Sequence, residues 1–315
     1  MVSSVDPAPT AAAGRTARPL RITVLCGGPS AEREVSLASG RAVAAALVRL
    51  GHRVHVADIS PDDCAALDVP ADVVFPVLHG TFGEDGQLQV MLEARGQRFV
   101  GSGSRASALA MDKLATKRLV QQTGLLTPEY SVVAALPAAL PAFGVPCVVK
   151  PIDQGSSVLT TIVRDAAAFS PAVAAVVDSF GRALGERFIA GREVTVGIVG
   201  GEVLPPITIR PRREFYDYAA KYEDSGTEYL FDAGHAPALL ERVREDSLRV
   251  FALLGCRHLA RMDWIVDTQE RHWFLEANTL PGFTSHSLVP MAAERSGCGF
   301  DQLCERLVRL AGDEP

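Results

Sequence analysis

The chain reads Arg261-Met-Asp-Trp-Ile-Val-Asp267 near its C-terminal end, and after a polar turn around Gln269 and Glu270 it continues as His272-Trp-Phe-Leu-Glu-Ala-Asn278. Two apolar runs on either side of a short polar turn predict a β-hairpin. Residues 264–266 are too apolar for a solvated edge strand, although an edge hairpin with scattered charges is the alternative. We therefore expect a hairpin that is largely buried.

The polar side chains of this hairpin fall on one face. Side chains alternate along a strand, so a turn centred between the two polar residues places Asp263 opposite Glu276. The same register places Arg261 opposite Asn278. Two carboxylates in that position repel each other unless a positive charge lies between them. The oxygens of Asp263, Glu276 and Asn278 suit a hard cation, most naturally Mg²⁺ held together with substrate phosphates. The hairpin therefore predicts a metal site.

Length and composition limit the class of protein. A chain of 315 residues exceeds one ordinary core and predicts two or three domains, and 48% hydrophobic with 22% charged residues is typical of a globular protein. The net charge of −6 argues against a nucleic-acid partner. No apolar run approaches the length of a membrane span. The six cysteines show no metal spacing, so we expect free thiols and a cytoplasmic protein. Residues 1–20 predict a disordered leader rather than a signal peptide.

The N-terminal part predicts a parallel sheet. Strands are expected at residues 21–25 and 53–58, with a helix at 32–50 between them, which makes a βαβ unit. A third buried strand at 73–78 ends just before His79. Loops beyond the carboxyl ends of such strands carry ligands in open α/β sheets, so His79 is a candidate binding residue.

A candidate phosphate loop lies further along the chain, between two long predicted helices at residues 106–124 and 166–184. Lys150 ends a buried strand, and Gly155-Ser-Ser157 follows it within a few residues. Small residues in such a loop offer backbone N–H groups to phosphate oxygens, and a lysine adds positive charge. The pattern is not a P-loop, and Gly-Ser turns are common linkers. Phosphate binding is the favoured interpretation of this loop only because a metal site is predicted in the hairpin further along the chain.

Several motifs occur in a fixed order along the chain. They are Gly27-Gly-Pro-Ser-Ala-Glu-Arg-Glu-Val-Ser36, His79-Gly-x-x-Gly-Glu-Asp-Gly86, Met111-Asp-Lys113, Lys150-Pro with Gly155-Ser-Ser157, Tyr218-x-x-Lys221-Tyr222, and Glu276-x-Asn-Thr-x-Pro-Gly-x-Thr-Ser-His-Ser-Leu-Val-Pro290. In this order they resemble the D-alanine–D-alanine ligases, which belong to the ATP-grasp superfamily. The resemblance covers residues 21 to about 310, and the last motif is the most specific.

The resemblance implies an α/β, three-domain ATP-grasp fold. A Rossmann-like N-terminal domain with a parallel sheet would span residues 21–105, and two α+β domains would span residues 106–195 and 196–315. The implied reaction joins two D-alanine molecules at the expense of ATP, through a D-alanyl phosphate, for peptidoglycan synthesis. A homodimer in the cytoplasm is expected on the same ground.

The resemblance also assigns residues to ATP and to metal. ATP would lie between the second and third domains, with its phosphates near lysines and its adenine and ribose in a pocket. The residues implied are Lys113, Lys150, Glu186, Phe188, Ile189, Glu193 and Lys221. Two Mg²⁺ ions, replaceable by Mn²⁺, would be held by Asp263, Glu276 and Asn278, in agreement with the hairpin argument.

A second set of residues is implied for the amino acids. Glu32 would hold the ammonium group of the first D-alanine and would connect through Ser156 to Tyr222 on a closing loop, with His79 nearby. Ser287 and Leu288 would receive the second D-alanine. Arg261 and the backbone N–H of Gly282 would stabilise the tetrahedral oxyanion.

The chain departs from the family pattern at Leu159, where a glycine usually follows Gly-Ser-Ser-x. If that glycine adopts a positive φ, leucine is strained and ATP affinity is the property affected. Two alternatives to the dipeptide ligase follow. One is a ligase that joins D-alanine to D-lactate or D-serine, which Tyr222 after Lys221 disfavours. The other is a nucleotide-binding homologue without turnover, which the intact metal residues disfavour.

Overall fold

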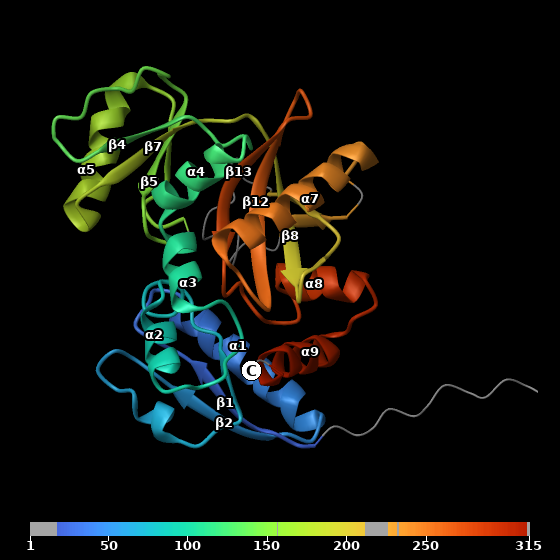
Figure 1. Cartoon of the computed structure of the whole chain (residues 1–315). Helices are drawn as coiled ribbons and strands as arrows, with labels where there is room; N and C mark the ends of the chain where they lie inside the picture. The colour runs from blue at the N-terminus through green and yellow to red at the C-terminus, as the bar shows by residue number, and fades with distance from the viewer. Residues whose placement is uncertain (1–17, 156, 212–225, 232, 314–315) are drawn as a thin grey trace, which may run out of the picture.

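Three β-sheets succeed one another along the chain (Figure 1). The structure, a computed structural model, describes residues 18–155, 157–211, 226–231 and 233–313. The predicted leader at residues 1–20 lies almost wholly outside them. The architecture is mixed α/β, as predicted, and the sheets follow one another in the chain order implied for the three domains, although the third sheet begins at Gly191, before the predicted boundary between residues 195 and 196. The domain boundaries themselves stay a prediction.

The N-terminal sheet is parallel, as predicted. Its strand order is β2-β1-β3, and α1 connects β1 to β2. At the carboxyl end of β1, Gly27 and Gly28 adopt φ values of 78° and 83°, a region that glycine enters without strain. The chain can therefore turn sharply into α1. The elements are β1 (Arg21–Cys26), α1 (Arg33–Arg49), β2 (Arg53–Asp58), β3 (Val73–Pro76) and α2 (Gln87–Ala94).

The helix expected at residues 106–124 is two helices. The structure has α3 (Ser104–Met111) and α4 (Lys113–Gln122), separated at Asp112. Asp112 has an extended backbone, and its carboxylate accepts a hydrogen bond from the Ala115 N–H at 2.9 Å. An aspartate at this position caps a new helix. The single-helix prediction is therefore wrong, because the apolar spacing continues across a residue that ends one helix and begins the next.

The middle sheet is antiparallel, with strand order β4-β7-β5-β6. The helix expected at residues 166–184 is too long. It ends at Gly181, where φ is 76°, and the following residues form a strand instead. The elements are β4 (Tyr130–Val133), β5 (Cys147–Pro151), β6 (Thr161–Val163), α5 (Phe169–Phe180) and β7 (Ala183–Arg187).

The third sheet contains the predicted hairpin. Its order is β11-β10-β8-β12-β13, so β12 is paired on both sides, as its apolar sequence predicts, and β13 is the edge. Helices α3 and α4 lie against that edge. The elements are β8 (Gly191–Val199), β9 (Glu202–Val203), β10 (Ile207–Arg210), β11 (Glu228–Leu230), α7 (Pro237–Leu254), β12 (Leu259–Asp267) and β13 (His272–Asn278).

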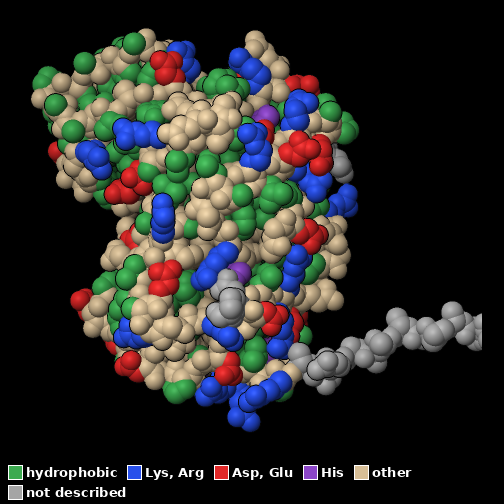
Figure 2. Space-filling model, viewed as in Figure 1, with side chains coloured by type: hydrophobic (Ala, Val, Ile, Leu, Met, Phe, Trp, Pro, Cys, Tyr) green, Lys and Arg blue, Asp and Glu red, His purple; other side chains and the backbone are tan. Residues whose placement is uncertain are grey.

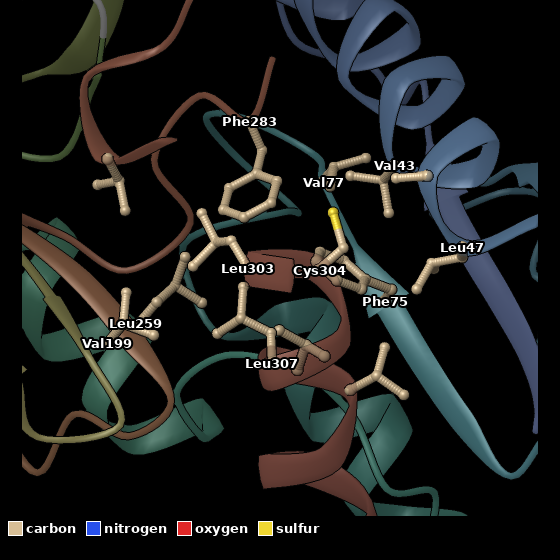
Figure 3. Close-up of a cluster of buried hydrophobic side chains, with 14 of the residues drawn as sticks. Val43, Leu47, Phe75, Val77, Val199, Leu259, Phe283, Leu303, Cys304 and Leu307 are labelled. Atoms are coloured by element: carbon tan, nitrogen blue, oxygen red, sulfur yellow. The ribbon is translucent and has the colours of Figure 1, made fainter. Parts of the chain in front are cut away.

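The C-terminal helix α8 (Leu288–Arg295) packs on β8 of the third sheet, and α9 (Phe300–Gly312) returns to α1 and to β3 of the N-terminal sheet. Figure 3 shows Leu303 and Leu307 of α9 among side chains from α1, β3 and β8. The first and third sheets therefore share one apolar core. Its members include Val43, Leu47, Phe75, Val77, Val199, Leu259, Phe283, Leu303, Cys304 and Leu307.

Charged side chains of both signs are interspersed on the face drawn in Figure 2, without a large area of one sign. Within the described part of the chain, no helix combines the length and apolarity that crossing a membrane requires.

Candidate active site

A cavity of about 330 Å³ is lined by residues of β5, β7, β8 and β13 together with the first residue of α4. It brings together residues that are far apart in the sequence, from Lys113 to Glu276. Every described residue that the resemblance assigns to ATP lines it, and so does one predicted metal ligand. These residues are Lys113, Lys150, Glu186, Phe188, Ile189, Glu193 and Glu276. Apolar side chains, including Val148, Ile265 and Leu275, complete the walls.

Lysines and carboxylates alternate on the polar side of this cavity. Lys150 Nζ lies 2.8 Å from Glu186 Oε2, and Lys113 Nζ lies 3.6 Å from Glu276 Oε2. Burial lowers the pKa of Lys113. Lys150 is buried too, but the neighbouring carboxylates of Glu186 and Glu276 outweigh burial and raise its pKa. The flanking carboxylates therefore favour the charged form of Lys150, which lines the cavity.

The hairpin has the predicted pairs but a different turn. Arg261 pairs with Asn278 and Asp263 with Glu276, as the sequence predicts. Nearer the turn, however, Trp264 pairs with Phe274, so the ladder shifts by one residue. A bulge of this kind changes the direction in which the neighbouring side chains point. It lets two successive residues of β13, Leu275 and Glu276, both line the cavity.

Asp263 is the most enclosed of the predicted metal ligands, with its side chain 5% exposed. Its carboxylate accepts hydrogen bonds from Arg261 Nη2 at 2.7 Å, from Thr195 Oγ1 at 2.6 Å and from Asn278 Nδ2 at 2.9 Å. Glu276 is more open, at 26%. Two carboxylates and an amide oxygen form a donor set that fits Mg²⁺. In the described residues, no cluster of three His, Cys, Asp or Glu side chains offers another such set.

A second polar group forms around His79, at the carboxyl end of β3. Its Nδ1 lies 3.1 Å from the carbonyl oxygen of Leu280, and burial lowers its pKa. Glu32 is buried beside it, and a Cβ placed on Gly155 would lie 3.7 Å from Glu32 Oε2. The first motif and the phosphate loop are thus close neighbours. Glu84 accepts a hydrogen bond from the Gly80 N–H at 2.7 Å.

The last motif folds back on itself at the start of α8. A Cβ on Gly282 would lie 3.2 Å from Ser287 Oγ, so a larger residue there would require the Ser287 side chain to shift. The Thr284 N–H donates to the same hydroxyl at 3.0 Å. Ser287 precedes Leu288, the first residue of α8, and both are half-buried. The residues predicted for the second D-alanine are therefore adjacent to the Gly282 backbone.

Three predicted residues, Ser156, Lys221 and Tyr222, lie outside the described residues. Leu159, in the phosphate loop, adopts a φ of 48°, which is the positive value that the usual glycine of this motif suggested. Its side chain is 42% exposed. The condition for strain stated from the sequence is therefore met.

Glu84 and Leu275 belong to the site, although the sequence alone assigned no role to either of them. Glu84 is part of the motif that begins at His79. Its place between two glycines of that motif is the sequence feature that could have indicated a role. Burial, followed by the nearby Glu32 carboxylate, raises the pKa of Glu84 to about 8. Leu275 lies at the bulge in β13 and lines the cavity, and no local sequence pattern predicts that bulge.

Comparison with known proteins agrees with this geometry. The family described as D-ala D-ala ligase C-terminus matches residues 119–309, and the corresponding N-terminus family matches residues 62–102. The D-alanine--D-alanine ligase of Gloeobacter violaceus is 45% identical over 297 residues, covering 92% of this chain and 98% of its own. The enzyme of that name from Chromohalobacter salexigens is 44% identical, covering 91% and 93%.

Solved structures give the same result. The D-alanine--D-alanine ligase of Bacillus anthracis complexed with ATP superimposes with a TM-score of 0.80 at 30% identity, covering 93% of this chain and 97% of that one. The VanG D-Ala:D-Ser ligase of Enterococcus faecalis reaches 0.81 at 26% identity, covering 93% and 100%. The chain belongs to the D-alanine–D-alanine ligase family.

Proposed function

We propose that this protein joins two molecules of D-alanine into D-alanyl-D-alanine, with conversion of ATP to ADP and phosphate, and so supplies a dipeptide for peptidoglycan. The observation that carries the proposal is the cavity. Residues assigned to ATP from scattered motifs line one space of about 330 Å³ together with Glu276 of the hairpin. A volume of that order suits a ligand of nucleotide size.

In the first step, a carboxylate oxygen of one D-alanine attacks the γ-phosphorus of ATP, and ADP leaves. Lys113 and Lys150 are proposed to neutralise the charge on the phosphate oxygens, because both are lysines that line the cavity. Glu32 is proposed to bind the ammonium group of that D-alanine. Glu32 lies close to Gly155, which supports an amino-acid site next to the phosphate loop.

Mg²⁺ is proposed as the metal, held by Asp263, Glu276 and Asn278, with Mn²⁺ as a substitute. When bound, it neutralises phosphate charge and orients the transferred group. Arg261 and Lys113 already lie against the two carboxylates, so they limit the repulsion between Asp263 and Glu276.

In the second step, the amine of the second D-alanine attacks the acyl carbon, the C–N bond forms and phosphate leaves. The tetrahedral intermediate carries a negative oxygen, which Arg261 and the Gly282 N–H are proposed to stabilise. Ser287 and Leu288 are proposed to contact the second D-alanine, since they adjoin Gly282. His79, buried on the β3 side, is proposed to line the amino-acid site.

The test is phosphate release from Mg-ATP with D-alanine alone, and with D-alanine plus D-lactate or D-serine. We expect release that depends on D-alanine, that yields the dipeptide, and that is lost in Glu276→Ala. Product analysis separates the dipeptide from the mixed products. A preference for D-lactate or D-serine would replace the proposed second substrate. ATP binding without release in any mixture would establish the homologue without turnover.

A homodimer and a cytoplasmic location are proposed on family resemblance. All six cysteines are free thiols in the structure, which suits a reducing compartment. Light scattering should give about twice the chain mass of 33.5 kDa, and a value near one chain mass would reject the dimer.

A further inference from the structure

Lys117 is a fully buried lysine that the proposed mechanism does not use. It lies one helical turn after Lys113 on α4, and its side chain is 0% exposed. Removing an ammonium group from water costs several kcal/mol unless partners compensate for the lost hydration. Lys117 does not line the 330 Å³ cavity. The chain therefore places a costly charge behind the wall of the site, where no ligand can touch it.

The partners of Lys117 define its place. Its Nζ lies 2.8 Å from Glu186 Oε1 and donates to Thr127 Oγ1 at 2.6 Å. The Thr127 hydroxyl in turn donates to the carbonyl oxygen of Phe274 on β13, at 2.9 Å. Burial lowers the pKa of Lys117 to about 8, so the group carries its charge at pH 7.

Glu186 lies between two lysines. One carboxylate oxygen pairs with Lys117 and the other with Lys150, each at 2.8 Å, and the Glu186 side chain is 3% exposed. The two lysines outweigh burial and keep the pKa of Glu186 below its ordinary value. The three groups together carry one net positive charge. Without Lys117, the Glu186 carboxylate would pair with Lys150 alone, and the net charge of that pair would be zero.

We propose that Lys117 is a positioning residue for the nucleotide: by sharing the Glu186 carboxylate, it leaves the positive charge of Lys150 available to the phosphates of ATP. This inference rests on the proposed function, since it concerns how that nucleotide is bound. A purely structural role is the competing account. A buried ion pair contributes little net stability, and an apolar pair of similar volume would serve the core at least as well.

The test is Lys117→Met, which keeps the length of the side chain and removes its charge. We expect the KM for ATP and the inhibition constant of ADP to rise about tenfold, the usual scale for one lost charge-assisted interaction. Inhibition by adenosine, which has no phosphates, should stay within about twofold, and so should the KM for D-alanine. Arg118→Met, at the exposed neighbouring position on α4, is the control. It should change neither the KM for ATP nor the inhibition constant of ADP.

A second substitution separates charge from structure. In Lys117→Met with Glu186→Gln, the net positive charge at Lys150 is restored, so the double variant should bind ADP more tightly than Lys117→Met alone. Thr127→Val removes a hydrogen bond of Lys117 and keeps its charge, so its KM for ATP should stay within about twofold of the wild type. Lys117→Gln provides the same comparison if Lys117→Met does not fold.

Two results would overturn the inference. One is an unchanged KM for ATP in a folded Lys117→Met protein. The other is an equal loss of affinity for adenosine and for ADP. That result would mean that the substitution deforms the cavity rather than removing positive charge from it. ADP binding by calorimetry tests the inference even if the wild type releases no phosphate with D-alanine. In that case the proposed function fails and the inference is judged separately.

Discussion

Arg261 and Asp263 illustrate how a single ion pair prepares the site. They lie two residues apart on β12, and Arg261 Nε and Nη2 donate to the two Asp263 oxygens at distances from 2.7 to 3.2 Å. Both side chains are mostly buried, at 15% and 5% exposure. The pair holds a guanidinium group next to the proposed metal ligands, where we propose that negative charge develops during the reaction.

Arg261→Ala should lower kcat by about 10²–10³, the usual loss for one oxyanion donor. It also leaves the buried Asp263 carboxylate without its cation, so thermal stability must be measured alongside turnover. Arg261→Lys is the matched variant, because it keeps the charge and loses the bidentate geometry. An Arg261→Lys enzyme with wild-type kcat would show that the fork of the guanidinium is not needed.

Leu159 is the residue at which the chain differs from its family. A leucine at a φ of 48° is strained by about 1–2 kcal/mol. Glycine would remove this strain, but its greater conformational freedom in the unfolded chain would cancel part of the gain in stability. Leu159→Gly should therefore lower the KM for ATP a few-fold with little change in melting temperature. Thr160→Gly is the control in the same loop and should raise that KM or leave it unchanged. A higher KM in Leu159→Gly would contradict the strain argument.

At the scale of the element, the hairpin of β12 and β13 is organised by Asp267 at its turn. The Asp267 carboxylate accepts hydrogen bonds from the Gln269 N–H at 2.9 Å, from Arg271 Nε at 2.8 Å and from Trp273 Nε1 at 2.9 Å. Burial opposes the charge, but these donors outweigh it and lower the pKa of Asp267 to about 2. The turn thus sets the register of the pairs next to it, and the bulge at Leu275 then brings Glu276 opposite Asp263.

Asp267→Asn should lower the unfolding free energy by about 1–2 kcal/mol at pH 7, allowing for solvent screening. Because the folded pKa is depressed, this stabilisation is present above about pH 4 and is lost as the pH falls through 2. The difference between wild type and variant should therefore shrink in urea unfolding between pH 4 and pH 2. A difference that stays constant with pH would mean that the charge is not the cause.

At the scale of the whole molecule, α9 joins the beginning of the chain to its end. Arg49 on α1 pairs with Asp301 at 2.5 Å, and His52 Nε2 lies 2.6 Å from Glu305. Beneath these polar contacts, Leu307 is 0% exposed in the core that the first and third sheets share. The N-terminal sheet, which carries Glu32 and His79, is therefore held against the sheet that carries the hairpin.

Leu307→Ala should destabilise the protein by about 2–5 kcal/mol, because the cavity left at the centre of the shared core cannot collapse freely. Leu248→Ala on α7, where the side chain is 39% exposed, is the control and should stay within about 0.5 kcal/mol. Calorimetry should show a lower melting temperature for the first variant only. Equal effects of the two substitutions would show that the shared core is not critical.

The sequence by itself determined the family, the parallel N-terminal sheet and the facing pairs of the hairpin. These depend on local information: the spacing of apolar residues, the alternation of strand side chains and the order of short motifs. The predicted pairing of Asp263 with Glu276 was correct even though the turn is centred half a residue from its predicted position. The bulge at Leu275 compensates for that difference.

Only the tertiary structure decided which distant segments meet. Lys117 gives no sign in the sequence that it is buried against Glu186, because the two are far apart along the chain and their contact arises when α4 packs beside β7. The shared core of α1 and α9 is equally invisible to periodicity, which marks an apolar face without naming its partner. Local patterns specify elements, whereas burial and ion pairing depend on how the packed elements exclude water.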